Sequence, residues 1–221
     1  MNIFVVNAYK NRQTKYLADV RYQLFPAVWW EDVTQDQVDK HHFYHNAKLE
    51  YRKKVVACSL SHKKLLLKII QEDLKNTIII EDDAIFDFDR LDELKDLKNF
   101  TYLGGEITSK LMKNMKQFEK EDKQQLISEL SVGINKIDHK IFKIGQTCGY
   151  FVPNATVAQD ILSNIPHGNK EKAIDTELVF LQRKEKITDF IFPPLVKLNV
   201  EEAKKGFTYS NYTLASNQEF Y

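Results

Sequence analysis

The apolar positions of this chain fall into short continuous runs and longer helix-spaced patterns. Residues 3–6 and 77–80 are β-branched or aromatic runs, and each predicts a buried strand. Between them, apolar residues recur every three or four positions over 55–71, which predicts an amphipathic helix ending before Asn76. A helix that leads into a fully buried strand is typical of α/β layer proteins.

Weaker patterns extend this order along the chain. Further strands are predicted at 25–30, at 100–103 and, irregularly, at 191–196. Further helices are predicted at 10–22, 156–165 and 175–182, with a short helix within 31–51 and a solvated helix or insertion over 110–130. The chain shows no internal repeat and no linker. We therefore predict one α/β domain over 1–221, with a mostly parallel central sheet flanked by helices.

Composition narrows the function classes. The 221 residues are 43% hydrophobic and 29% charged, as in ordinary globular proteins. The net charge is +1, so no bulk charge excess favours nucleic acid or an anionic membrane. No apolar run approaches the ~20 residues that span a bilayer, and the N-terminal residues lack a signal-peptide pattern. These features predict a cytoplasmic enzyme with at most peripheral membrane contact and no nucleic-acid partner.

The cysteines and most histidines do not by themselves indicate a metal site or a catalytic site. Cys58 and Cys148 lack metal-binding spacing and are expected to be buried free thiols. His41, His42 and His45 have no carboxylate or cysteine partner at a suitable spacing, so solvated or packing roles are expected. A histidine on the apolar face of a helix is usually a hydrogen-bonded core residue, and this is the expectation for His62 on its own.

The strongest chemical signal is the acidic end of the second buried run, Glu81-Asp82-Asp83. Ligands of open α/β sheets bind beyond the carboxyl ends of the strands. Consecutive carboxylates repel one another, and hard divalent cations such as Mn²⁺ and Mg²⁺ prefer oxygen ligands. Period-two geometry would place Glu81 and Asp83 on one side of the strand and Asp82 on the other. A solvated acidic turn is the alternative reading.

Taken in order, several segments resemble one family, the lipooligosaccharide-type glycosyltransferases of family 25. The family includes bacterial β-galactosyltransferases and collagen galactosyltransferase modules. The resemblance rests on these segments: Asn7 with Arg12, Ala57-Cys58-Ser59-Leu60-Ser61-His62, Glu81-Asp82-Asp83, Thr147-Cys148-Gly149-Tyr150-Phe151-Val152, Ile174-Asp175 and Pro194-Leu195-Val196. The Ser-His helix followed by Glu-Asp-Asp is the most specific combination among them.

The resemblance implies a GT-A-like nucleotide-sugar-binding sandwich. It also implies inverting transfer of a hexose, galactose or glucose, from a UDP-sugar to an oligosaccharide or glycolipid acceptor in lipopolysaccharide or other surface-glycan biosynthesis. Mn²⁺ or Mg²⁺ would be held by Asp83 with Glu81, where it offsets charge on the departing diphosphate. Asp175 is the candidate general base, and a simple helix N-cap is its alternative reading.

The resemblance and the chemistry of individual residues together give a candidate donor-binding set. Arg can pair with phosphate, and glycines after a strand allow close approach of a ligand to the backbone, although a simple turn explains Gly104-Gly105 equally well. The candidate donor-binding residues are Asn7, Arg12, Ser61, His62, Glu81, Asp82, Gly104 and Gly105. Two other functions stay open: a non-catalytic sugar- or nucleotide-binding module on the same fold, and a metal-dependent nucleotidyltransferase.

Overall fold

A computed structural model describes residues 1–7, 21–41, 47–109, 121–166 and 171–199 of the chain. Its strands are β1 (Asn2–Asn7), β2 (Gln23–Pro26), β3 (Thr77–Glu81), β4 (Ala84–Phe86), β5 (Thr101–Ser109), β6 (Gly133–Lys136), β7 (Phe142–Val152), β8 (Asp189–Phe192) and β9 (Val196–Leu198). Its helices are α1 (Gln35–Asp39), α2 (Leu49–Gln71), α3 (Glu121–Ser128), α4 (Ala155–Asn164) and α5 (Ile174–Arg183), with 3₁₀ turns η2 (Trp30–Asp32) and η3 (Phe88–Leu94).

The described strands form a central sheet in the order β2-β1-β3-β7-β5-β8-β6 and a small sheet of β4 and β9. Strand β1 runs parallel to β2 and to β3, and β5 runs parallel to β8. Strand β7 is antiparallel to both β3 and β5, and β6 is antiparallel to β8. Five of these seven described strands therefore point the same way. The predicted α/β class with a mostly parallel sheet is confirmed, and it is consistent with a GT-A-like fold.

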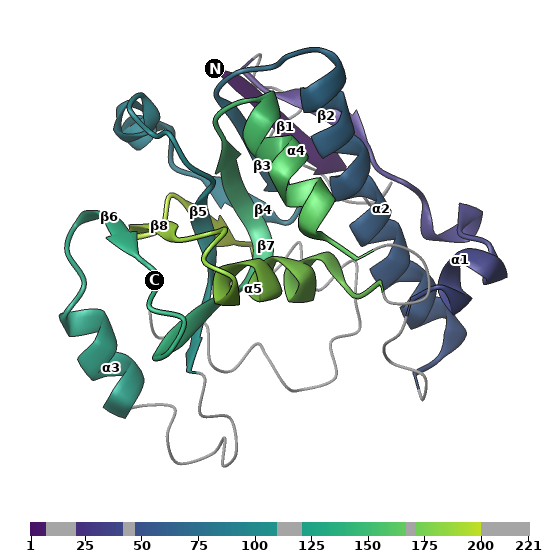
Figure 1. The fold of residues 1–221 in the computed structure, drawn as a ribbon. Helices are drawn as coiled ribbons and strands as arrows, with labels where there is room; N and C mark the ends of the chain where they lie inside the picture. The colour runs from purple at the N-terminus through teal and green to yellow at the C-terminus, as the bar shows by residue number, and fades with distance from the viewer. Residues whose placement is uncertain (8–20, 42–46, 110–120, 167–170, 200–221) are drawn as a thin grey trace.

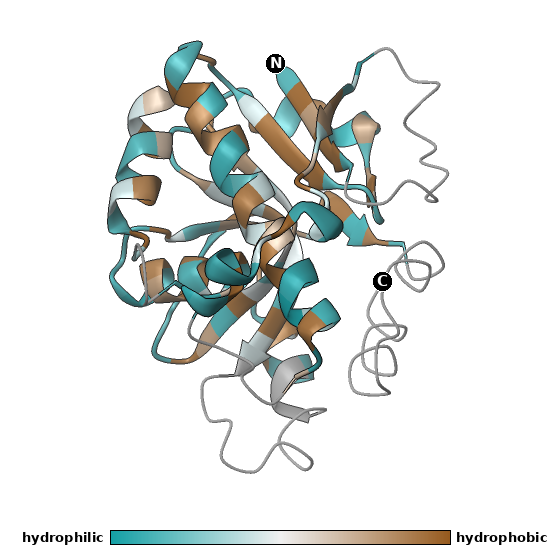
Figure 2. Cartoon of the chain, turned by 90° about the vertical axis from the view of Figure 1, so that its right-hand side faces the viewer, coloured by the Kyte–Doolittle hydropathy of each residue, from teal (hydrophilic) through white to brown (hydrophobic). Residues whose placement is uncertain are grey.

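The two faces of the sheet carry different layers. Helices α2, α4 and α5 pack on one face (Figure 1), where their apolar residues join those of the strands in the larger core cluster. On the other face, η3 and the β4–β9 sheet close a second cluster. Figure 2 shows helices that alternate between hydrophobic and hydrophilic residues beside mostly hydrophobic strands, as expected for elements buried on one side or on both.

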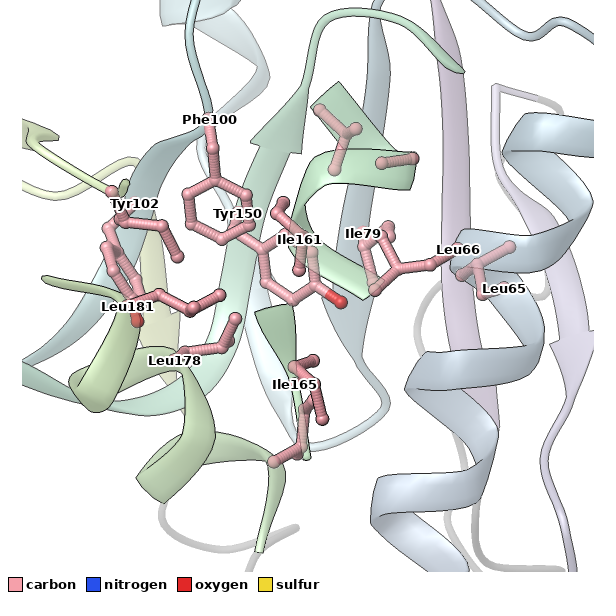
Figure 3. Packing of buried hydrophobic residues seen from close by; sticks show 14 of the residues in the cluster. Leu65, Leu66, Ile79, Phe100, Tyr102, Tyr150, Ile161, Ile165, Leu178 and Leu181 are labelled. Carbon is pink, nitrogen blue, oxygen red and sulfur yellow. The ribbon is translucent and has the colours of Figure 1, made fainter. Parts of the chain in front are cut away.

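Aromatic residues fill the centre of the larger cluster. Tyr150 of β7 lies opposite Ile79 of β3, and its ring stacks on Phe100 with centroids 4.9 Å apart. Figure 3 shows Tyr150 in the middle of this cluster, between Phe100 and Ile79. All three side chains are almost fully buried. The core therefore extends directly beneath the end of β3.

Most of the long elements match the sequence predictions. Strands β1 and β3, and helices α4 and α5, fall within a residue or two of their predicted bounds. Helix α2 begins at Leu49 rather than near residue 55, because its first turns carry mixed polar residues without a clear apolar stripe. The predicted helix at 10–22 lies mostly outside the described residues, as do residues 110–120 of the predicted insertion.

Three predicted strands were wrong in extent. Strand β2 ends at Pro26: the Ala27 N–H still donates to the Asn7 carbonyl of β1, but the Val28 N–H donates to the Ser61 hydroxyl on α2 instead. The segment 191–196 is two strands in two different sheets, β8 and β9, separated by Pro193 and Pro194.

The third correction concerns the predicted strand at 100–103. Strand β5 does not end at Leu103 but continues through Gly104 and Gly105 to Ser109, since β7 supplies a pairing partner along this length with local register shifts. The two glycines are therefore strand residues, not a closing turn.

No helix within the described ranges combines the length and the apolar character that crossing a membrane would require.

Candidate functional site

Strands β1 and β3 end side by side. Residues 77–80 of β3 are fully buried, and Glu81 at its carboxyl end is paired with Val6 of β1. Asn7, the next residue of β1, therefore lies beside the acidic end of β3. The Oδ1 atom of Asn7 is buried and has no hydrogen-bond partner among the described residues. A buried acceptor of this kind is suited to a ligand donor group. Arg12, the other predicted residue of this region, lies outside the described residues.

The three acidic residues do not continue as a strand. Strand β3 ends at Glu81, and Asp82 and Asp83 form a turn that leads into β4. The prediction that Glu81 and Asp83 share one side of an extended strand was therefore wrong, because the chain turns before the alternation can proceed. Asp82 is almost fully buried, whereas Glu81 and Asp83 are partly buried.

Helix α2 presents two side chains to Glu81. Cys58 and His62 are four residues apart, so they lie on the same helix face. The Nε2 atom of His62 lies 3.1 Å from Oε1 of Glu81, and the Sγ atom of Cys58 lies 3.9 Å from the same oxygen. The side chain of His62 has no exposed surface. The imidazole is thus a buried link between α2 and the end of β3.

The second ring nitrogen of His62 reaches the neighbouring strand. Its Nδ1 atom lies 2.7 Å from the hydroxyl of Tyr150. Burial raises the pKa of Tyr150 well above its ordinary value, so this hydroxyl keeps its proton and can donate it in a hydrogen bond. Nδ1 therefore faces the Tyr150 hydroxyl, and Nε2–H donates to the Glu81 carboxylate. The expected hydrogen-bonded role of His62 is confirmed.

Asp175, which belongs to one of the last segments on which the resemblance rests, also lies near this region of the fold. It lies in the first turn of α5, and its Oδ1 atom accepts the Thr176 N–H at 2.6 Å. Burial raises the pKa of Asp175, and the negative charge of Glu81 raises it further, whereas Thr176 and His62 lower it. Asp175 and Glu81 are therefore close enough for their charges to interact.

The thiol of Cys58 lies near all four carboxylates of this region. Its pKa is raised well above the ordinary value, first by burial and then by Glu81, Asp175, Asp83 and Asp82, in that order. All four carboxylates therefore lie within electrostatic range of one sulfur atom. Burial likewise raises the pKa of Cys148. Both cysteines are free in the structure, as predicted, although Cys58 is partly rather than fully buried as a residue.

Other predicted residues have structural contacts that sequence reasoning did not foresee. Ser61 is buried, donates to the Ala57 carbonyl at 2.7 Å and accepts the Val28 N–H at 2.9 Å, which ties the segment after β2 to α2. Gly104 packs against Val196 of β9: a Cβ atom at this position would overlap the Val196 carbonyl oxygen. At Gly105, a Cβ atom would lie 2.7 Å from the Gly145 carbonyl oxygen.

Of His41, His42 and His45, the structure describes His41, which has a carboxylate neighbour that the sequence did not indicate: its Nε2 atom lies 3.4 Å from Oε2 of Glu171. His41 is buried, and its Nδ1 lies 2.8 Å from the Gln37 carbonyl oxygen. His42 and His45 lie outside the described residues.

Among the described residues near the end of β3, two sets of side chains offer ligand atoms for a cation. The ligand atoms of Cys58, His62 and Glu81 lie within 4.8 Å of one another, and a sulfur–nitrogen–oxygen set of this kind suits zinc. Burial and the four neighbouring carboxylates raise the pKa of the Cys58 thiol, whereas a cysteine binds metal as the thiolate. Glu81 and Asp83 offer only oxygen ligands, which fits a hard divalent cation better.

Sequence reasoning missed two residues that organise the site. Tyr150 orients His62, and the hydroxyl of Ser59 accepts the N–H of Ile174 at 3.0 Å, directly before Asp175. Both residues belong to segments singled out above, Ser59 two positions before Ser61 and Tyr150 in the Gly-Tyr strand. Their roles depend on contacts between distant parts of the chain, which no local pattern encodes.

Comparison with known proteins identifies the family. The sequence model of glycosyltransferase family 25 (LPS biosynthesis protein) matches residues 4–178, so the chain belongs to this family and is a glycosyltransferase of the lipopolysaccharide-biosynthesis type. The matched region runs from β1 into α5 and contains every predicted site residue from Asn7 to Asp175. No curated protein matches the chain.

Proposed function

We propose that this member of family 25 transfers a hexose, galactose or glucose, from a UDP-sugar to a hydroxyl of an oligosaccharide or glycolipid acceptor. The transfer inverts the anomeric centre and is assisted by Mn²⁺ or Mg²⁺. Family membership supports the reaction class. The identity of the donor, the inversion and the metal are the parts that we add.

One observation carries the proposal: a single stretch of α2 contacts both the end of β3 and the start of α5. Cys58 and His62 contact Glu81, and Ser59 between them accepts the N–H of Ile174. The acidic strand end and Asp175 lie far apart in the chain, yet both are tied to the same helix. This arrangement supports a common site for the two carboxylate groups.

The carboxylates fit the predicted cation by their chemistry. Glu81 and Asp83 are hard oxygen ligands at the end of a strand, where nucleotide ligands of α/β sheets bind. Burial raises the pKa of Asp175 and the negative charge of Glu81 raises it further, as expected where carboxylates gather without full compensation. Glu81 and Asp83 would hold the ion. When bound, a divalent cation offsets the negative charge that develops on the departing diphosphate.

Asp175 is suited to act as the general base. A base with a raised pKa takes up a proton more readily at neutral pH than an ordinary aspartate does. The proton of the acceptor hydroxyl moves to the Asp175 carboxylate while the hydroxyl oxygen attacks the anomeric carbon and the bond to UDP breaks. His62 keeps Glu81 in place throughout through its Nε2–H, and does not itself exchange a proton with substrate.

The test is a panel of nucleotide sugars with and without Mn²⁺, measured for transfer, for hydrolysis and for binding. We expect UDP-hexose turnover that depends on the metal, and a loss of at least about 10²-fold in Asp83→Ala. Asp92→Ala, which removes a largely exposed carboxylate on η3, is the matched control. Unchanged turnover in Asp83→Ala would contradict the metal assignment.

Two outcomes would replace the proposal. Binding of UDP-sugar and metal without any transfer or hydrolysis would indicate a sugar- or nucleotide-binding module. A preference for nucleoside triphosphates with Mg²⁺ would indicate a nucleotidyltransferase.

A further inference from the structure

Two serines in one stretch of α2 make the same unusual pair of contacts. Each hydroxyl donates to the backbone carbonyl four residues earlier, Ser59 to Val55 at 3.1 Å and Ser61 to Ala57 at 2.7 Å. Each oxygen also accepts a backbone N–H from a distant segment. Both side chains are buried. Helix α2 therefore uses two hydroxyls to hold two separate segments of the chain.

The amide held by Ser59 belongs to the first residue of α5, Ile174. The first N–H groups of a helix lack partners within the helix and need an acceptor from elsewhere. Ala173, the N-cap residue of α5, has no side chain that could supply one. Ser59 is thus a cap provided by another helix, and Figure 1 shows the start of α5 beside α2.

We propose that Ser59 is a positioning residue for the transfer reaction, acting through Asp175. This inference rests on the proposed function, in which Asp175 is the general base. Because Asp175 directly follows Ile174, the Ser59 hydrogen bond fixes the helix turn that carries the carboxylate. Cys58 and His62, on either side of Ser59, contact Glu81. The distance between the base and the acidic strand end is therefore set by one short stretch of α2.

The expected consequence is kinetic. A displacement of about 1 Å in a reacting group can lower a rate by about 10²-fold. Without the Ser59 hydroxyl, the first turn of α5 loses the contact that fixes it to α2, and Asp175 moves relative to Glu81. Donor binding depends on the strand ends and is expected to change little.

The experiment compares Ser59→Ala with Asn154→Ala. Asn154 caps α4 through a hydrogen bond of the same length, 3.0 Å from its Oδ1 to the Val157 N–H, so the control loses an equivalent helix-start contact on another helix. We expect kcat for transfer to fall about 10- to 100-fold in Ser59→Ala, with KM for the UDP-sugar within about twofold, and to stay near the parent value in Asn154→Ala. Ser59→Cys keeps the volume with a weaker acceptor and replaces the alanine variant if that variant does not fold.

A double-mutant cycle tests whether Ser59 acts through Asp175. In an Asp175→Asn background, Ser59→Ala should cause no further loss of kcat, because the group that it positions is already gone. Losses that multiply would overturn the inference and leave the proposed function standing, as would equal losses in Ser59→Ala and Asn154→Ala. Full turnover in Asp175→Asn alone would overturn the general-base assignment itself, and this inference with it.

Discussion

The two faces of the central sheet differ sharply near the end of β3. On the helix face, buried polar groups of α2 and β7 form a connected set, with His62 between Tyr150 and Glu81. On the opposite face, the contacts are apolar and close: Val196 of β9 packs against Gly104 and Gly149, where any Cβ atom would overlap it. The same strands thus carry a hydrogen-bonded polar region on one face and dense packing on the other.

We infer from this difference that the helix face serves the reaction and that the β9 face serves the stability of the fold. Buried polar groups and carboxylates contribute less to folding than well-packed apolar groups of the same size, and they persist where chemistry requires them. Close backbone packing has the opposite character, because it tolerates no added atom yet offers no reactive group. Substitutions on the helix face should therefore alter turnover first, and substitutions on the β9 face should alter stability first.

The largest expected effect is on the helix face, in Asp175→Asn. The amide cannot accept the proton of the acceptor hydroxyl, so kcat should fall by about 10²- to 10⁴-fold. Affinity for UDP, measured by calorimetric titration, should be unchanged. Asp160→Asn, an exposed carboxylate on α4, is the control and should keep its turnover. If UDP binding weakened in Asp175→Asn while turnover persisted, Asp175 would belong to the donor site instead.

The next largest effect is on the β9 face, in Gly104→Ala. The added methyl overlaps the Val196 carbonyl oxygen, and the free energy of unfolding should fall by about 1–3 kcal/mol. In Gly145→Ala, the added Cβ would lie 3.9 Å from the Glu106 carbonyl oxygen, so this control should change stability by less than about 0.5 kcal/mol. Chemical denaturation measures both.

The same pair also tests the predicted donor-binding role of Gly104. If folded Gly104→Ala protein had a raised KM for the UDP-sugar without loss of stability, Gly104 would be assigned to the donor site rather than to a packing role.

The sequence predicted the elements whose patterns are long or unambiguous. The buried runs of β1 and β3 and the periodic helices α2, α4 and α5 were recovered, together with the acidic end of β3. Strands β4, β6 and β9 were not, because three or four residues at an edge carry too little pattern to separate them from loops. The predicted strand at 100–103 was too short, because the extension of β5 depends on its pairing with β7 rather than on its own residues.

The candidate site divides in the same way. Glu81, Asp83 and Asp175 could be proposed because carboxylates at strand ends and helix starts are local features. The links that join them could not, since Ser59 is 115 positions from Ile174 and His62 is 88 positions from Tyr150. Such contacts exist only once α2 packs against β3, β7 and the start of α5.

A smaller effect should distinguish the two bonds of His62. Tyr150→Phe removes the hydroxyl at Nδ1 but leaves the contact between Nε2 and Glu81. The free energy of unfolding should therefore fall by about 1 kcal/mol, and turnover should be retained. His62→Ala removes both bonds and should lower turnover as well as stability. Thermal melts and steady-state rates on the two variants check this. Equal turnover losses in both variants would show that Tyr150 has a direct part in the reaction.

The smallest expected effect is the pH dependence of stability that Asp175 contributes. Burial raises its pKa in the folded state above the value in the unfolded chain, so the folded protein binds the proton more tightly. Stability should therefore fall as pH rises through the interval between the two pKa values, and turnover should rise as pH passes through the folded-state pKa, where the base ionises. Asp175→Asn should be more stable than the parent at neutral pH, and the difference should vanish at low pH.

Glu93 provides a control of opposite sign on η3. Its hydrogen bond to Arg90 lowers the pKa of the Glu93 carboxyl, so this pair stabilises the fold above the unfolded pKa and loses that effect as pH falls. Glu93→Gln should accordingly be slightly less stable than the parent at neutral pH, by a small amount because the pair is partly exposed. Denaturation curves across a pH series measure both variants. If Asp175→Asn, like Glu93→Gln, were less stable than the parent at neutral pH, the Asp175 carboxylate would be stabilised by its contacts in the folded state. The helix face would then stabilise the fold as the opposite face does.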